Sequence, residues 1–198
     1  MMQTDLQQLM FGKDNLETIT TTLENSGLIL YPTDTIWGIG CDATNEDAVQ
    51  RIFDLKKRPY DNPFVILVNS IEMLKNYVEH VHPRIETLLI HHLQPLTMIY
   101  DRAKNLPAIS HDRNGSVAIR VVQDSFCKEL IGQFGKPLIA SSANINDKPF
   151  PANFGGISSD VITGVDYVVK WKQGEKKLSQ PSVIAKFSEK EELIFLRE

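Results

Sequence analysis

Apolar residues repeat at helical spacing in several stretches of the chain, and short apolar runs lie between them. The first stripe predicts a helix over 14–25, with Asp14 and Glu17 as a capping box at its start. Further helices are expected after the Asn45 cap through Leu55, from the Ser70 cap to Val78, from Pro83 through Leu89, and over 125–134, where Gly135 closes the helix.

Several apolar runs are too short for helices and predict strands. They lie at 28–31, 64–68, 96–100, 116–122, 138–140, 167–169, 182–187 and 193–197. The last two indicate an antiparallel hairpin, whereas the earlier alternation of helices and strands is typical of the α/β class. We therefore predict one domain over 9–198, in which helices flank a single twisted mixed β-sheet.

Composition disfavours several classes of function. The chain has 198 residues, 42% of them hydrophobic, and a net charge of −4, which disfavours broad contact with nucleic-acid phosphates. Its two cysteines, Cys41 and Cys127, lie far apart without metal-ligand spacing, so we expect no metal site. The start of the sequence lacks the pattern of a secretion signal, and no apolar run has membrane-spanning length. We expect a cytoplasmic protein with no membrane contact.

Three polar segments follow predicted strands or helices and carry the candidate chemistry. They are Pro32-Thr33-Asp34-Thr35, Lys56-Lys57-Arg58-Pro59 and Ser141-Ser142-Ala143-Asn144, of which the first and third are read as turns. Lys56, Arg58 and Asn62 would surround a strand end, where α/β proteins commonly bind ligands. Paired cations at that place favour a phosphate ligand, although a charged helix end alone explains them about as well.

Two other features of the sequence have competing explanations. Gly38-Ile39-Gly40-Cys41-Asp42-Ala43 fits a dinucleotide fingerprint only weakly, because no helix begins at these glycines, and a turn with close packing is favoured. Arg120 points to the opposite face of its predicted strand from Val117 and Ile119, between apolar neighbours, and such a charge needs a partner.

Taken together and in this order, the Pro-Thr-x-Thr, Lys-x-Arg-Pro and Ser-x-Ala-Asn motifs resemble the YrdC/YciO family of threonylcarbamoyl-AMP synthases, over about 28–197. The resemblance implies a mixed sheet around a deep, positively lined cavity. It also implies a nucleotidyltransferase that converts L-threonine, bicarbonate and ATP, with Mg²⁺ on the nucleotide, into threonylcarbamoyl-AMP and pyrophosphate. The product serves the threonylcarbamoyladenosine modification of tRNA, with possible handover to a tRNA-modifying complex.

The resemblance also implies roles for particular residues. Lys56 and Arg58 would be the catalytic cations that face the phosphates. Threonine would contact Thr35, Arg120, Ser142 and Ser182, and the nucleotide would contact Arg58, Asn62, Ser116, Asn144 and Arg197.

Two alternatives remain open from the sequence. The same cavity lined by cations would suit an RNA-binding, translation-associated module, although the net charge weighs against more than weak or indirect RNA binding. A sister enzyme that makes another carbamoyl adenylate is the other alternative. A screen of amino acids as substrates separates it from the synthase.

Overall fold

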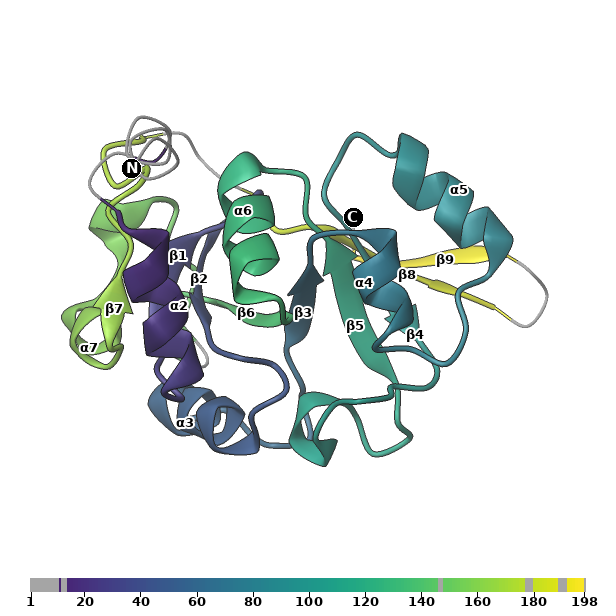
Figure 1. Cartoon of the computed structure of the whole chain (residues 1–198), viewed down its shortest axis with the longest axis horizontal. Coiled ribbons are helices and arrows are strands. Elements are labelled where there is room, and N and C mark those ends of the chain that lie inside the picture. The colour runs from purple at the N-terminus through teal and green to yellow at the C-terminus, as the bar shows by residue number, and fades with distance from the viewer. Residues whose placement is uncertain (1–10, 12–13, 146–147, 177–179, 189–191, 198) are drawn as a thin grey trace.

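This computed structural model describes residues 11, 14–145, 148–176, 180–188 and 192–197. A nine-stranded mixed sheet spans the molecule (Figure 1). The strands are β1 (Ile29–Pro32), β2 (Trp37–Gly40), β3 (Val65–Val68), β4 (Leu96–Tyr100), β5 (Val117–Val121), β6 (Leu138–Ser142), β7 (Tyr167–Val168), β8 (Val183–Phe187) and β9 (Leu193–Arg197). Their order across the sheet is β7-β1-β2-β6-β3-β5-β4-β8-β9. Pairs β1–β7, β3–β5 and β4–β8 are parallel and the others antiparallel, so the predicted mixed α/β sheet with a closing hairpin is confirmed.

Helices pack around this sheet. In the described part of the chain they are α2 (Leu16–Glu24), α3 (Glu46–Lys56), α4 (Ile71–Lys75), α5 (Pro83–His91), α6 (Ser125–Phe134) and α7 (Ser159–Thr163), with short 3-10 turns at Ala108–Ser110 and Phe154–Gly156. The predicted caps of two helices are confirmed: the side chain of Asn45 accepts the Ala48 N–H, and that of Ser70 accepts the Met73 N–H. Helix α6 ends at Gly135, whose φ of 75° is left-handed.

The predicted capping box at the first helix is wrong. Asn15, one residue later, caps α2 by accepting the N–H of Glu17 at 2.8 Å. Asp14 is buried and instead accepts the backbone N–H groups of Lys170 and Trp171, at 2.9 and 2.6 Å. Its carboxylate therefore joins the start of the fold to the segment after β7, a long-range contact that local sequence does not signal.

Two predicted turns are strands. Gly38, Ile39 and Gly40 belong to β2, and Ser141 and Ser142 are the last residues of β6. The two strands pair with each other, Gly38 opposite Ser142 and Ile39 opposite Ser141. This pairing extends β6 through polar residues that would otherwise favour a turn.

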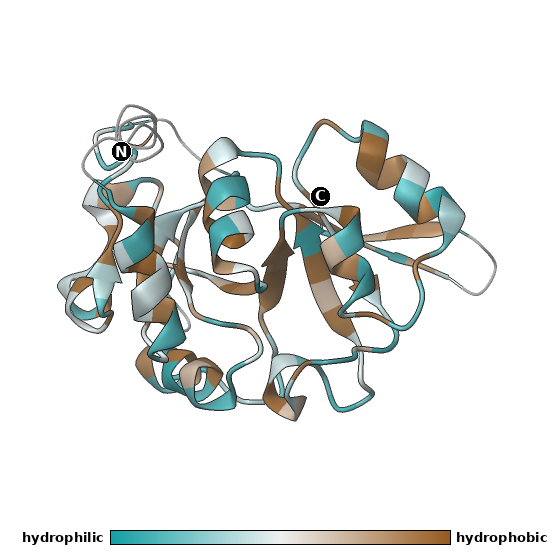
Figure 2. Cartoon of the chain, in the orientation of Figure 1, coloured by the Kyte–Doolittle hydropathy of each residue, from teal (hydrophilic) through white to brown (hydrophobic). Residues whose placement is uncertain are grey.

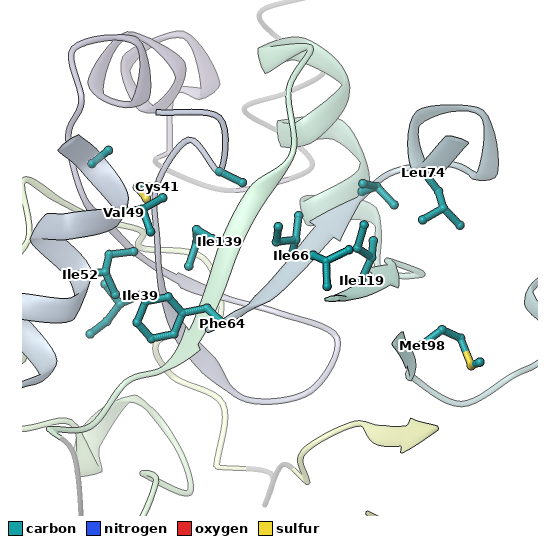
Figure 3. Packing of buried hydrophobic residues seen from close by; sticks show 14 of the residues in the cluster. Ile39, Cys41, Val49, Ile52, Phe64, Ile66, Leu74, Met98, Ile119 and Ile139 are labelled. Atoms are coloured by element: carbon teal, nitrogen blue, oxygen red, sulfur yellow. The ribbon is translucent and has the colours of Figure 1, made fainter. Parts of the chain in front are cut away.

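The core divides between the two faces of the sheet. Leu30, Ile66 and Ile119 belong to one buried cluster, whereas their neighbours Ile29 and Leu67 belong to the other, as strand alternation requires. Figure 2 shows hydrophobic residues along β3 and most of β5, and helices in which hydrophobic and hydrophilic residues are mixed. Figure 3 shows the first cluster, in which residues of β2, β3, β5 and β6 meet side chains of α3 and α4.

Close packing at the glycines of β2, which the sequence predicts, leads to a prediction for stability. A Cβ added at Gly40 would lie 2.5 Å from the Tyr31 ring and 2.6 Å from the Ile139 carbonyl oxygen. Gly40→Ala is therefore expected to lower the free energy of unfolding by about 1–3 kcal/mol, measured by urea denaturation. Gly132→Ala, in α6 with a single neighbour at 3.4 Å, is the control and is expected to leave stability unchanged or higher. Equal stabilities of the two variants would contradict the packing.

No helix in the described part of the chain is long and apolar enough to cross a membrane. The predicted domain limits, residues 9 and 198, lie outside the described residues, and the domain boundaries stay a prediction.

Candidate functional site

A hollow of about 480 Å³, here called the arginine hollow, lies over the middle of the sheet. Its floor includes Val65 with its register partners Ala118 and Ala140, and Gly38 on the adjacent strand β2. These residues share a face of the sheet, and three of them have small side chains or none. Small residues on neighbouring strands leave space above the sheet, which explains why a hollow forms at this place.

Seven of the ten predicted site residues line the arginine hollow. They are Thr35, Arg58, Asn62, Arg120, Ser142, Ser182 and Arg197. They come from segments far apart in the sequence: the β1–β2 turn, the segment after α3, strand β5, the end of β6 and the two edges of the closing hairpin. Lys56, Ser116 and Asn144 are not among its lining residues.

Arg58 enters the hollow because of the way α3 ends. The helix stops at Lys56, and Lys57 takes a left-handed conformation with φ of 53° that redirects the chain. The Arg58 guanidinium then donates to the backbone oxygen of Asn62 at 2.7 Å and to its Oδ1 at 2.6 Å, and lies 5.0 Å from the centre of the Phe64 ring. Burial lowers the pKa of Arg58, but the group stays a fixed cation at neutral pH.

Lys56 does not face the hollow, unlike Arg58. It is 1% exposed, and its Nζ donates to the carbonyl oxygens of Ser142, at 2.5 Å, and Asn144, with Asn144 Oδ1 at 3.4 Å. Burial, and then the charge of Arg58, lower its pKa to about 7. Lys56 therefore ties the end of α3 to the end of β6, next to the Ser142 side chain that lines the hollow. These hydrogen bonds from Lys56 to the Ser142 and Asn144 carbonyl oxygens are here called the latch.

Arg120 has the partner that its position in the sequence requires. Its Nη2 lies 3.0 Å from Oδ1 of Asp34, and both side chains are almost fully buried. Burial raises the pKa of Asp34, while Arg120 lowers it. Asp34 was not predicted as a functional residue. The signal was present, however, because a buried arginine needs a carboxylate and one of the three polar segments contains this one.

Ser182 and Arg197 are joined by hydrogen bonds. Arg197 donates from Nε and Nη2 to the Ser182 carbonyl oxygen, at 3.1 and 2.9 Å, and Ser182 Oγ lies 2.8 Å from the hydroxyl of Thr97. Thr97 is buried on β4 and was not among the predicted site residues, although a hydroxyl between the apolar Leu96 and Met98 is a signal in the sequence. Burial, and then the charge of Arg120, lower the pKa of Arg197, so the two cations are close enough to interact.

Hydroxyl groups fix the β1–β2 turn. Thr33 Oγ1 donates to the Ile36 carbonyl oxygen at 2.7 Å, accepts the Thr35 N–H at 3.1 Å and lies 2.9 Å from Thr35 Oγ1. Thr35 is 9% exposed. This turn also borders a larger hollow of about 810 Å³, whose lining includes Asp34 and shares Thr33, Thr35, Ile36 and Pro181 with the arginine hollow.

The remaining two predicted residues make local contacts. Ser116, just before β5, donates its hydroxyl to Asp112 at 2.7 Å. The Asn144 amide donates to the carbonyl oxygens of Ile145 and Lys148, so it shapes the loop after β6. Neither side chain reaches the arginine hollow in this structure.

The arginine hollow is suited to a ligand with several negative charges. Three arginines, Arg58, Arg120 and Arg197, line one space together with three serines and two threonines. Guanidinium groups match carboxylate and phosphate oxygens, and hydroxyls supply uncharged hydrogen bonds. Among the described residues, no group of three or more His, Cys, Asp and Glu side chains is arranged to hold a metal ion.

Comparisons with known proteins agree with this fold. A threonylcarbamoyl-AMP synthase of Vibrio parahaemolyticus is 32% identical over 139 residues, which cover 69% of this chain and 75% of that protein. The Sua5 protein of P. abyssi, solved in complex with L-threonine, superposes with a TM-score of 0.81 at 26% identity, over 92% of this chain. This chain matches 53% of that one, so it spans about half its length.

E. coli YciO has the same fold, with a TM-score of 0.79 at 18% identity over 92% of this chain and 88% of the other. The model of the Sua5/YciO/YrdC family, described as "Telomere recombination", matches residues 21–198. The chain therefore belongs to the Sua5/YciO/YrdC family.

Proposed function

We propose that the protein is a nucleotidyltransferase that makes threonylcarbamoyl-AMP and pyrophosphate from L-threonine, bicarbonate and ATP. The observation that carries this proposal is the arginine hollow, because it gathers seven of the residues that the sequence predicts for threonine and nucleotide. Relatives with this name, and the threonine complex of P. abyssi Sua5, support it.

The hollow has complementary groups for both substrates. We assign the threonine carboxylate to Arg120 and the polar groups of threonine to the hydroxyls of Thr35, Ser142 and Ser182. The phosphates are assigned to Arg58 and Arg197, and Asn62 orients the Arg58 fork. Lys56 acts through the end of β6 rather than by touching the phosphates.

The reaction needs positioning and charge more than an acid or base from the protein. The neutral amine of threonine attacks the carbon of bicarbonate or carbon dioxide and forms a carbamate, with loss of water in the first case. A carbamate oxygen then attacks the α-phosphorus of ATP, and pyrophosphate leaves. Charge that builds on the phosphates is stabilised by Arg58 and Arg197. We propose that Mg²⁺ arrives with the triphosphate and neutralises part of its charge.

The product carries an activated acyl-phosphate bond, and a second protein must transfer its threonylcarbamoyl group to tRNA. We propose handover to a tRNA-modifying complex in the cytoplasm, with no RNA-binding role for the hollow itself beyond weak or indirect contact. The net charge of −4 supports this division of work.

Pyrophosphate release tests the proposal. The full chain is incubated with ATP, Mg²⁺ and bicarbonate, with and without L-threonine, and the expected result is release that depends on threonine. Serine, valine and other amino acids are run in parallel. Release with another amino acid and none with threonine would identify the sister enzyme. No release with any amino acid would reject the proposed reaction.

A further inference from the structure

The guanidinium of Arg120 is buried with one of its N–H donors unpaired. Arg120 lies on β5, is 4% exposed and lines the arginine hollow. Its Nε–H is buried without a hydrogen-bond partner in the described part of the chain. Arginine has five donors in a fixed fork, and an unmet buried donor is costly. The group is therefore arranged to receive an acceptor that is not part of these residues, such as a ligand carboxylate.

Charges around Arg120 would displace it if nothing held it. Arg58 and Arg197 line the same hollow, and the charge of Arg120 contributes to lowering the pKa of Arg197. Like charges in a partly buried space repel one another, and a desolvated cation favours a rotamer that reaches water. An anion is therefore needed to hold the Arg120 guanidinium in one conformation against this repulsion.

Asp34 is that anion, and its own position is fixed. Its Oδ1 lies 3.0 Å from Arg120 Nη2, an ion pair that lacks the alignment of a full hydrogen bond, and its Oδ2 accepts the backbone N–H of Gln123 at 3.4 Å. The threonines on either side are tied into the β1–β2 turn by their hydroxyls. Asp34 thus connects the β1–β2 turn to an arginine of β5, which is separated from β2 in the sheet by β6 and β3.

We propose that Asp34 is the positioning residue for substrate recognition: it holds the Arg120 guanidinium so that its unpaired Nε edge receives the carboxylate of the amino-acid substrate. The inference rests on the proposed function, which assigns that carboxylate to Arg120. Asp34 acts through Arg120 and does not touch the reacting atoms. Its removal should therefore weaken binding of the amino acid far more than binding of the nucleotide.

The test compares Asp34→Asn with the wild-type chain by steady-state kinetics and by calorimetric titration with L-threonine. The expected result is a KM and a Kd for threonine raised at least about tenfold, as is typical when a residue that orients a ligand-binding group is removed. KM for ATP and kcat at saturating threonine are expected to stay within about twofold. Asp34→Glu, which keeps the charge, is expected to recover part of the affinity.

Asp47→Asn is the matched control, because Asp47 is exposed in the first turn of α3 and makes no contact with either hollow. A double-mutant cycle with Arg120→Met covers the case in which Asp34→Asn alone does not fold, since Arg120→Met/Asp34→Asn leaves no unpaired charge. Arg120→Met and the double variant are expected to bind threonine equally weakly.

The outcomes separate the two proposals. If the wild-type chain fails to bind threonine, the assigned substrate is wrong. If it binds threonine but Asp34→Asn has an unchanged Kd, the positioning role is wrong and the proposed function stands. Equal losses for threonine and ATP would show a general structural role and would also overturn the inference, as would a further loss of threonine affinity on adding Asp34→Asn to Arg120→Met.

Discussion

Arg58→Met is expected to lower kcat/KM for threonine-dependent pyrophosphate release by about 10²–10³, the usual effect of removing one preorganised charge contact at a developing anion. Arg58 is held by two hydrogen bonds to Asn62 and by the Phe64 ring, so it needs no reorganisation when the phosphates bind. Steady-state kinetics with varied ATP measures the effect.

Arg58→Lys separates charge from shape. A lysine keeps the positive charge but cannot make the two-point contact with Asn62, so we expect it to restore only a small part of the lost activity. Arg102→Met is the control, since Arg102 is an exposed arginine, 3.8 Å from Glu79, that lines neither hollow. Activity of Arg58→Met within about threefold of the wild-type value would count against a phosphate role for this residue.

Lys56→Met is expected to reduce both stability and activity. It removes the Lys56 donor from the carbonyl oxygens of Ser142 and Asn144, although the Ser142 oxygen keeps the Asn144 N–H at 2.8 Å, so we expect a loss of about 1–3 kcal/mol in the free energy of unfolding. It also frees the end of β6, and misplacement of a contact group by about 1 Å is enough to lower the rate about 10²-fold. Lys57→Met is the control, because the neighbouring Lys57 is exposed and has no part in the latch. Similar losses in both variants would contradict the latch.

The pH dependence of folding gives an independent test of the same contact. Burial, and then Arg58, lower the pKa of Lys56 from 10.5 to about 7. Between these values the unfolded chain binds a proton that the folded chain does not, so this residue makes stability rise with pH from about 7 to 10.5. Below pH 7 the folded state bears the full penalty of the buried charge. The difference in unfolding free energy between wild type and Lys56→Met, from urea denaturation, should increase across that window. A flat difference would contradict the shifted pKa.

The sequence predicted elements well where local signals determine them. Helix α6 runs over Ser125–Phe134 as expected, because Gly135 provides the left-handed residue that ends it. Strand β2 was missed because a short, glycine-containing segment has weak strand propensity and forms only through pairing with β1 and β6. The same long-range pairing extends β6 through Ser142. Pairing between strands that are distant in the sequence therefore determines β2 and the end of β6, where local propensity is weak.

The sequence predicted seven residues that line the arginine hollow, but not the contacts among them. The three polar segments meet because the β1–β2 turn, the end of α3 and the end of β6 converge on one hollow. The sequence did not reveal that Lys56 would bind carbonyl oxygens and not face the hollow, since a lysine at a helix end gives no signal for a carbonyl partner. The need of Arg120 for a partner was clear from strand alternation, but the identity of Asp34 required the sheet order.

A crystal structure of the chain with L-threonine and a non-hydrolysable ATP analogue would show directly whether both substrates bind in the arginine hollow. We expect the threonine carboxylate on Arg120 and the phosphates against Arg58 and Arg197, within one hollow. A threonine bound away from Arg120, or phosphates bound where neither Arg58 nor Arg197 reaches them, would contradict it.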